Sequence, residues 1–254
     1  MASKATVSSP SPTAASVRLI GDDDDDLENQ CVLHGVFEAE VLPFKESVLK
    51  VWHGDKVLRG MGMDEEGLNA QLYASQKKGT KMAAVSGEKL LSDEIAAINL
   101  YTCETPIYRR LNQLLRSRQR EDIKVWLPFL KLLLTALHKL KTATENTFYR
   151  GVHLDLSPKY TKGKDFVWWQ FTSTTQTVDC LESFLGKNDG RTIFCIRTKQ
   201  AVGIKMYSAI GIEDEYLIIP GISWVVKSAL NVGGGCTMIQ LEADPDAPSF
   251  IPGF

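Results

Sequence analysis

The pattern of apolar residues changes near residue 147, and this change most constrains the fold. Before it, apolar side chains recur at helical spacing, as in Ile107, Leu111, Leu114 and Leu115. After it, short apolar or β-branched runs alternate with turn residues, which is typical of strands. Helices followed by strands favour an α+β fold over alternating α/β.

The helical part runs from about residue 88 to 143. Ser92 is expected to cap one helix, and Thr105-Pro106 to begin a second. A third is expected from Leu127 to Lys141, with Pro128 either starting or kinking it. The expected strands are Thr147 to Val152, Val167 to Thr172, Thr192 to Arg197, Glu215 to Ile219, Ser223 to Val226 and Thr237 to Leu241.

The chain divides into three parts on this pattern. Residues 1–30 are rich in Ser, Ala and Pro and end in the run Asp22 to Asp26, so we expect a disordered acidic tail. Residues 31–87 have no clear role, and Val48 to Trp52 fits either a strand or a helical turn. Residues 88–254 are expected to form the main folded domain, which contains both the helices and the strands.

Three short motifs follow one another after the change of pattern. They are Phe148-Tyr149-Arg150-Gly151, then Phe171-Thr172-Ser173-Thr174-Thr175, then Glu213-Asp214-Glu215. An arginine fork suits phosphate, and a serine hydroxyl can donate and accept at once. If residues 213–215 are extended, the carboxylates of Glu213 and Glu215 point to the same side.

The order of these motifs resembles the arginine-specific mono-ADP-ribosyltransferases, in the branch that includes clostridial toxins. The resemblance extends upstream to Leu91-Ser92-Asp93-Glu94, Tyr101-Thr102, and Asn112 with Arg116, and it covers roughly residues 88–243. Thr175 departs mildly from the serine that often ends the second motif. The resemblance implies a β core of two packed, mainly antiparallel sheets with an NAD cleft between them.

The resemblance also implies roles for individual residues. Arg150 would hold the pyrophosphate of NAD, and the backbone of Gly151 would contact the nicotinamide amide. Ser173 would position the nicotinamide ribose and steady Glu215, while Phe184 would stack on nicotinamide or simply fill the core. The loop from Tyr207 to Ile212 would recognise the acceptor.

The two glutamates suit the chemistry of that family. Breaking a glycosidic bond builds up oxocarbenium character, which a nearby carboxylate such as Glu215 stabilises. Glu213 would hold and deprotonate an incoming guanidinium, which is otherwise a poor nucleophile. The expected reaction transfers ADP-ribose from NAD, or alternatively NADP, to arginine on a protein. The alternatives are an NAD glycohydrolase and a non-catalytic NAD- or partner-binding module.

Net charge, apolar runs and cysteine spacing limit the partners, the location and the metals that we expect. A net charge of −2 argues against a nucleic-acid partner, and no apolar run suggests a membrane span, a secretion signal or a lipid anchor. Five irregularly spaced cysteines support neither a disulfide framework nor a zinc site, so we expect a cytoplasmic protein without a metal. Arg109, Arg110, Arg116, Arg118 and Arg120 fit a solvated helix face better than an acidic partner.

Overall fold

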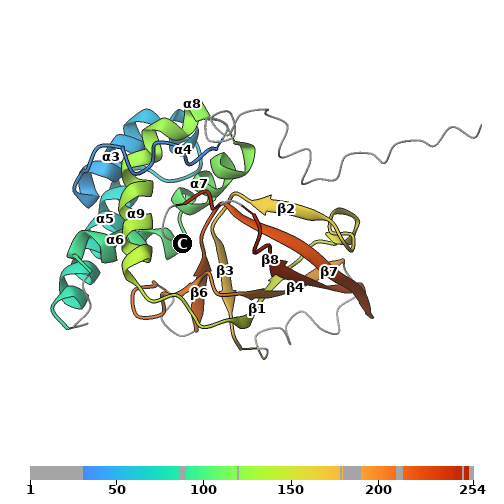
Figure 1. Cartoon of the computed structure of the whole chain (residues 1–254). Coiled ribbons are helices and arrows are strands. Elements are labelled where there is room, and N and C mark those ends of the chain that lie inside the picture. Colours follow the sequence, from blue (N-terminus) through green and yellow to red (C-terminus); the bar gives the residue numbers. More distant parts are fainter. Residues whose placement is uncertain are drawn as a thin grey trace, which may run out of the picture.

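The computed structural model describes residues 31–85, 90–118, 120–177, 179, 190–209, 214–247 and 249–251, with helices gathered to one side of a sheet (Figure 1). The helices are α3 (Phe44–Gly54), α4 (Lys56–Arg59), α5 (Glu65–Ala83), α6 (Ser92–Thr102), α7 (Pro106–Ser117), α8 (Arg120–Ile123) and α9 (Leu127–Lys139), with 3-10 turns η1 (Lys124–Trp126) and η2 (Ser157–Lys159). The strands are β1 (Asn146–Val152), β2 (Asp165–Trp168), β3 (Thr172–Thr175), β4 (Arg191–Thr198), β5 (Ala201–Gly203), β6 (Glu215–Ile218), β7 (Ile222–Gly233) and β8 (Cys236–Ala243). The predicted α+β class is confirmed.

Two of the predicted helix starts are confirmed, and a third needs correction. Pro106 and Pro128 lie in the first turns of α7 and α9, where a missing N–H costs no helical hydrogen bond. The capping position of α6 is Leu91, not Ser92, and the Leu91 N–H donates to the Glu94 carboxylate at 2.8 Å.

Residues 31–85 form a helical layer on α6 and α9 and share one hydrophobic core with the sheet. Val48, Val51 and Trp52 are buried along α3, so this ambiguous stretch is helical. Helix α5 packs tightly on α6 at Gly79, where a Cβ atom would lie 2.2 Å from the Ser92 carbonyl oxygen. This close contact fixes the position of α6, which contributes several side chains to the candidate site.

The strands form one sheet in the order β2-β7-β8-β4-β1-β3-β6-β5. Neighbouring strands are antiparallel except for β4 and β8, which are parallel. The prediction of two separate sheets is wrong in this detail, because β1 and β3 are joined at the pair Tyr149 and Thr175. That single pair is the junction between a five-stranded and a three-stranded part.

Two features of the strands differ from the prediction. The expected strand from Val167 to Thr172 is split into β2 and β3, because the Phe171 N–H donates to the Asn112 side chain at 3.1 Å instead of continuing a ladder. The short strand β5 pairs with β6 at the sheet edge and was not predicted.

The arginines of α7 do not all lie on a solvated face. Arg110 is buried, and its Nε donates to Asp55 Oδ2 at 2.8 Å. The Trp126 Nε1 donates to the same oxygen at 3.0 Å, while the other Asp55 oxygen caps α4 through Val57 and Leu58. This network joins α4, α7 and η1.

In the part of the chain that the structure describes, every helix is too short or too polar to cross a membrane.

Candidate active site

Strand register brings the three sequence motifs together at the junction of the sheet. Thr175 of β3 pairs with Tyr149 of β1 on one side and with Glu215 of β6 on the other. Arg150 follows Tyr149 along β1, and Ser173 lies two residues before Thr175 on β3. Residues 65 positions apart in sequence, Arg150 and Glu215, therefore flank the same strand.

Arg150 is anchored across this junction by its side chain. Its Nη1 donates to the Ser173 carbonyl oxygen at 2.9 Å. Burial lowers the pKa of Arg150 from its ordinary value, the nearby Tyr101 acts in the opposite direction, and the charge of Arg116 lowers it further. A guanidinium stays protonated at neutral pH despite such a shift, so the site holds a fixed positive charge next to a second arginine.

Tyr101 of α6 lies close enough to both Arg150 and Glu215 for their charges to act on it. Burial raises the pKa of Tyr101, so its hydroxyl is neutral at physiological pH. Asn112 of α7 donates to this hydroxyl at 2.9 Å and accepts from the Phe171 N–H at 3.1 Å. Asn112 therefore links α6, α7 and the residue that precedes β3 on one side of the candidate site.

Glu215 is held by a residue that the sequence did not single out. The hydroxyl of Ser208 donates to Glu215 Oε2 at 2.6 Å, and Ser208 is buried. We expected Ser173 to steady this carboxylate. That role of the Ser173 hydroxyl stays a prediction, and the Ser173 carbonyl oxygen accepts a hydrogen bond from Arg150 Nη1.

Helix α6 positions the loop that carries Ser208. The Asn99 side chain donates to the Tyr207 carbonyl at 3.0 Å, and the Ala209 N–H donates to the Thr102 hydroxyl at 2.9 Å. Both α6 residues are buried. The resemblance pointed to Tyr101-Thr102, but a loop seven residues before Glu215 leaves no pattern that would identify Ser208.

The other predicted site residues divide into described and undescribed ones. Ser173 is half-buried on β3, and Gly151 pairs with Ile193 of β4 directly after Arg150. Glu213 and Phe184 lie outside the described residues.

Two clefts adjoin this cluster. One of about 610 Å³ includes Glu215 and Tyr207 and is bordered by Lys141, Lys205 and the half-exposed Met206. The other, of about 340 Å³, lies beyond Arg116 and is lined by basic and aromatic side chains: Arg116, Lys159, Tyr160, Lys164, Phe166, Val167, Trp168, Trp169 and Gln170.

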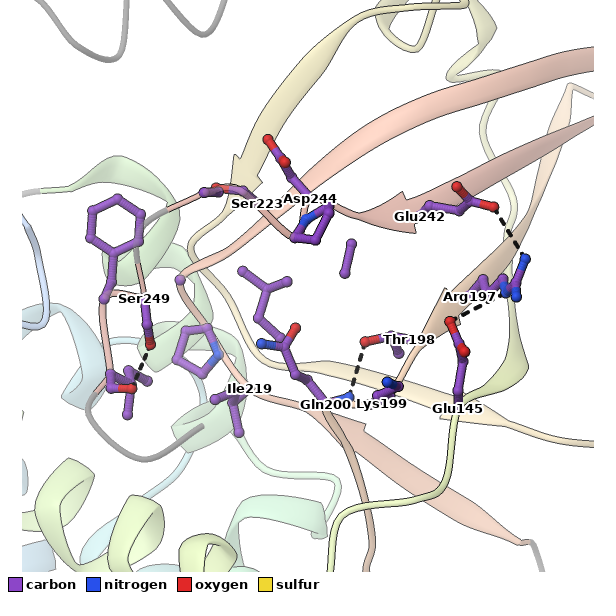
Figure 2. A pocket seen from close by; sticks show the side chains of 18 residues that line it. Glu145, Arg197, Thr198, Lys199, Gln200, Ile219, Ser223, Glu242, Asp244 and Ser249 are labelled. Carbon is purple, nitrogen blue, oxygen red and sulfur yellow. Dashed lines mark hydrogen bonds and ion pairs between the residues drawn. The ribbon is translucent and has the colours of Figure 1, made fainter.

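A third cleft, of about 670 Å³, is separate from these residues (Figure 2). It is enclosed by the end of β4, the β6–β7 turn and the segment that follows β8. Arg197 pairs there with Glu145 at 3.4 Å and with Glu242 at 3.6 Å. None of Arg150, Ser173 and Glu215 lines it, so its size does not make it the candidate active site.

The chemistry available in the cluster follows from its charges. Two arginines can bind an anion with two negative charges, and the Glu215 carboxylate also lies close to Tyr101. Within the described ranges, no group of three His, Cys, Asp or Glu side chains is arranged to hold a metal ion. The arrangement suits a substrate that carries a diphosphate and develops positive charge at a neighbouring carbon.

A comparison with protein families agrees with this geometry. The family model described as NAD:arginine ADP-ribosyltransferase matches residues 63–247. No curated protein sequence matches the chain significantly.

Solved structures share the fold at low sequence identity. The ADP-ribosyltransferase HopU1 of Pseudomonas syringae pv. tomato DC3000 has 20% identity and a TM-score of 0.57, covering 81% of this chain and 99% of its own. The eukaryotic mono-ADP-ribosyltransferase ART2.2, solved with NAD, has 20% identity and a TM-score of 0.57, covering 77% and 83%. The ADP-ribosyltransferase Vis, solved with agmatine, has 19% identity and a TM-score of 0.51, covering 77% and 93%.

Proposed function

Because this chain belongs to the NAD:arginine ADP-ribosyltransferase family, we propose that it transfers ADP-ribose from NAD to an arginine side chain of a protein and releases nicotinamide. NAD is the donor substrate of the family, and the arginine acceptor is our proposal for this chain. The observation that carries it is the junction at Thr175, where the arginine of β1 and the glutamate of β6 flank one strand.

Arg150 and Arg116 bind the pyrophosphate in this proposal. The positive charge of each arginine lowers the free-energy cost of burying a phosphate. Each planar guanidinium group can also donate two parallel hydrogen bonds to the phosphate oxygens. Arg116 Nη1 is oriented by Gln170 Oε1 at 2.7 Å, and Arg150 Nη1 by the Ser173 carbonyl. Among the described residues, the remaining N–H groups of both guanidinium groups have no hydrogen-bond acceptor, so they can donate to the ligand.

Glu215 stabilises the positive charge that develops on the nicotinamide ribose as the glycosidic bond breaks. The Ser208 hydrogen bond fixes the orientation of this carboxylate before the substrate arrives. Ser173 contributes a hydroxyl to the ribose, the backbone of Gly151 contacts the nicotinamide amide, and Phe184 stacks on the nicotinamide ring.

The acceptor arginine enters next to Glu215. The cleft of about 610 Å³ that includes Glu215 and Asp214 borders the β5–β6 side of the sheet. Glu213, which precedes Asp214 directly, pairs with the guanidinium and takes its proton as the new bond forms. The acceptor nitrogen then attacks the anomeric carbon while nicotinamide leaves.

Incubation with NAD labelled in the adenylate part, together with agmatine as a small guanidino acceptor, tests this proposal. We expect nicotinamide and a labelled agmatine adduct to form in equal amounts. Nicotinamide release without adduct would instead identify an NAD glycohydrolase. NAD binding without either product would identify a non-catalytic binding module.

Two features of the setting also belong to the proposal. We expect an arginine-bearing protein as partner, with neither nucleic acid nor membrane, and a cytoplasmic location. Among the described residues, Cys31, Cys103, Cys195 and Cys236 are free thiols.

A further inference from the structure

The basic and aromatic cleft beyond Arg116 has more positive charge than the pyrophosphate of NAD requires. Lys159 and Lys164 line it together with Arg116. None of these three cations has an ion-pair partner among the described residues, whereas Arg197, Lys205 and Lys227 each have one. Unpaired cations gathered in one cleft indicate an anionic ligand.

The cleft continues directly from the proposed pyrophosphate site. Arg116 and Tyr160 both line it, and both lie close enough to Arg150 to influence its pKa. A dinucleotide with its nicotinamide ribose at Glu215 and its diphosphate at Arg150 and Arg116 therefore extends its adenosine into this cleft. The cleft volume, about 340 Å³, and its aromatic lining suit a nucleoside.

The segment that carries the two lysines is held in place by its own contacts. The Lys164 ammonium donates to the Lys159 carbonyl at 2.8 Å, and the Gly163 N–H donates to the Val226 carbonyl at 2.8 Å. Tyr160 holds residues 159–164 against β2, because its hydroxyl accepts from Trp168 Nε1 at 3.1 Å and its ring packs edge-on against Phe166. The lysines are thus presented on a fixed turn.

The side chains that line the cleft also lack a group typical of NAD-selective sites. In Rossmann-type sites that select NAD, a carboxylate binds the 2′-hydroxyl of the adenosine ribose, whereas a basic residue there accommodates the 2′-phosphate of NADP, and the same charge argument applies to a different fold. No carboxylate lines the described part of this cleft. A 2′-phosphate carries close to two negative charges at neutral pH, which matches two lysines.

We propose that Lys159 and Lys164 bind the 2′-phosphate of NADP, so that this chain uses NADP at least as efficiently as NAD. The inference rests on the proposed function, because that function sets the direction in which the dinucleotide lies. It adds a donor preference and names the residues that determine it. The 2′-phosphate takes no part in the bond that breaks.

The test compares kcat/KM for nicotinamide release from NAD and from NADP, with agmatine as acceptor. We expect the wild-type NADP/NAD ratio to be one or higher. The double variant Lys159→Ala/Lys164→Ala should lower that ratio at least tenfold. Lys162→Ala is the matched control, because Lys162 is exposed on the same turn but does not line the cleft, and it should leave the ratio unchanged.

Two results would overturn the inference. One is a wild-type ratio below one, and the other is a double variant in which both donors lose efficiency equally, which would assign the lysines to the shared pyrophosphate. Calorimetric titration of Glu215→Gln with NAD and NADP separates this failure from failure of the proposed function. Tighter binding of NADP that disappears in the double variant supports the subsite even if no transfer occurs, and equal binding of both dinucleotides refutes it.

Discussion

Replacing Ser208 by alanine removes the hydrogen bond from its hydroxyl to Glu215 and tests whether the orientation of Glu215 matters for turnover. The Ser208 hydroxyl lies 2.6 Å from Glu215 Oε2 and is buried. A hydrogen bond to a charged group contributes about 1.5–3 kcal/mol. Because Glu215 is only half-buried, we take the lower half of this range, which corresponds to a loss of roughly 10- to 40-fold in kcat.

The expected loss is confined to kcat for nicotinamide release. Ser208 contacts Glu215 and is not one of the residues proposed to bind NAD, so the dissociation constant of NAD from calorimetry should change less than about twofold. Ser228→Ala is the matched control, since the Ser228 hydroxyl also donates to a side chain, Gln240, at 2.8 Å, but on the exposed part of β7. Its kinetics should equal those of the wild type.

The reasoning fails if Ser208→Ala keeps wild-type kcat, because the carboxylate would then need no help in orientation. It also fails if kcat and NAD affinity fall together with the melting temperature. That pattern would mean that Ser208 holds the loop of residues 204–209 rather than the carboxylate. Circular dichroism melting curves of both serine variants distinguish these results.

Three further predictions concern the phosphate clamp, the acceptor and the helical layer. Arg150→Lys keeps the charge but loses the paired geometry, so calorimetry should show NAD binding at least about tenfold weaker, and unchanged affinity would remove Arg150 from the site. Glu213→Gln should abolish the arginine adduct while slow NAD hydrolysis survives, and equal loss of both would show that Glu213 helps to break the bond. Asp55→Asn should cost about 3–5 kcal/mol in urea unfolding, because it leaves the buried Arg110 uncompensated, and a loss below 1 kcal/mol would contradict this. Burial alone would raise the pKa of Asp55, but hydrogen bonds from Arg110 and Trp126 lower it. The ionised Asp55 therefore stabilises the fold fully above about pH 4, and this stabilisation is lost as the pH falls through the lowered pKa. The acid unfolding profile of Asp55→Asn should lack this pH-dependent loss.

The sequence predicted those parts of the molecule that depend on local spacing. Pro106 and Pro128 mark helix starts because proline fits a first helical turn, and the apolar runs after Thr147 mark strands because their side chains alternate. The order of Arg150, Ser173 and Glu215 predicted that they share a site. The structure adds that Thr175 pairs with strands on both sides and so brings the motifs together.

Contacts between distant residues could not be predicted from one sequence. Arg110 looks like a surface residue of an amphipathic helix, and only its partner Asp55, 55 positions away, explains its burial. Ser208 lies in a loop without periodicity, so its hydrogen bond to Glu215 depends on Asn99 and Thr102, about 107 positions earlier, which hold that loop. The single joined sheet likewise depends on one pair between β1 and β3.

The most direct test of the central claim is the Glu215→Gln variant, examined for NAD binding and for nicotinamide release in the same preparation. Glutamine keeps the size of the side chain and can still accept from Ser208, but it cannot stabilise a developing cation by charge. We predict NAD affinity within about threefold of wild type and a loss of at least about 100-fold in nicotinamide release, on the order of 3 kcal/mol in the barrier. Nicotinamide release at the wild-type rate, with NAD affinity unchanged, would contradict the claim that Glu215 stabilises the cation formed when the glycosidic bond to nicotinamide breaks.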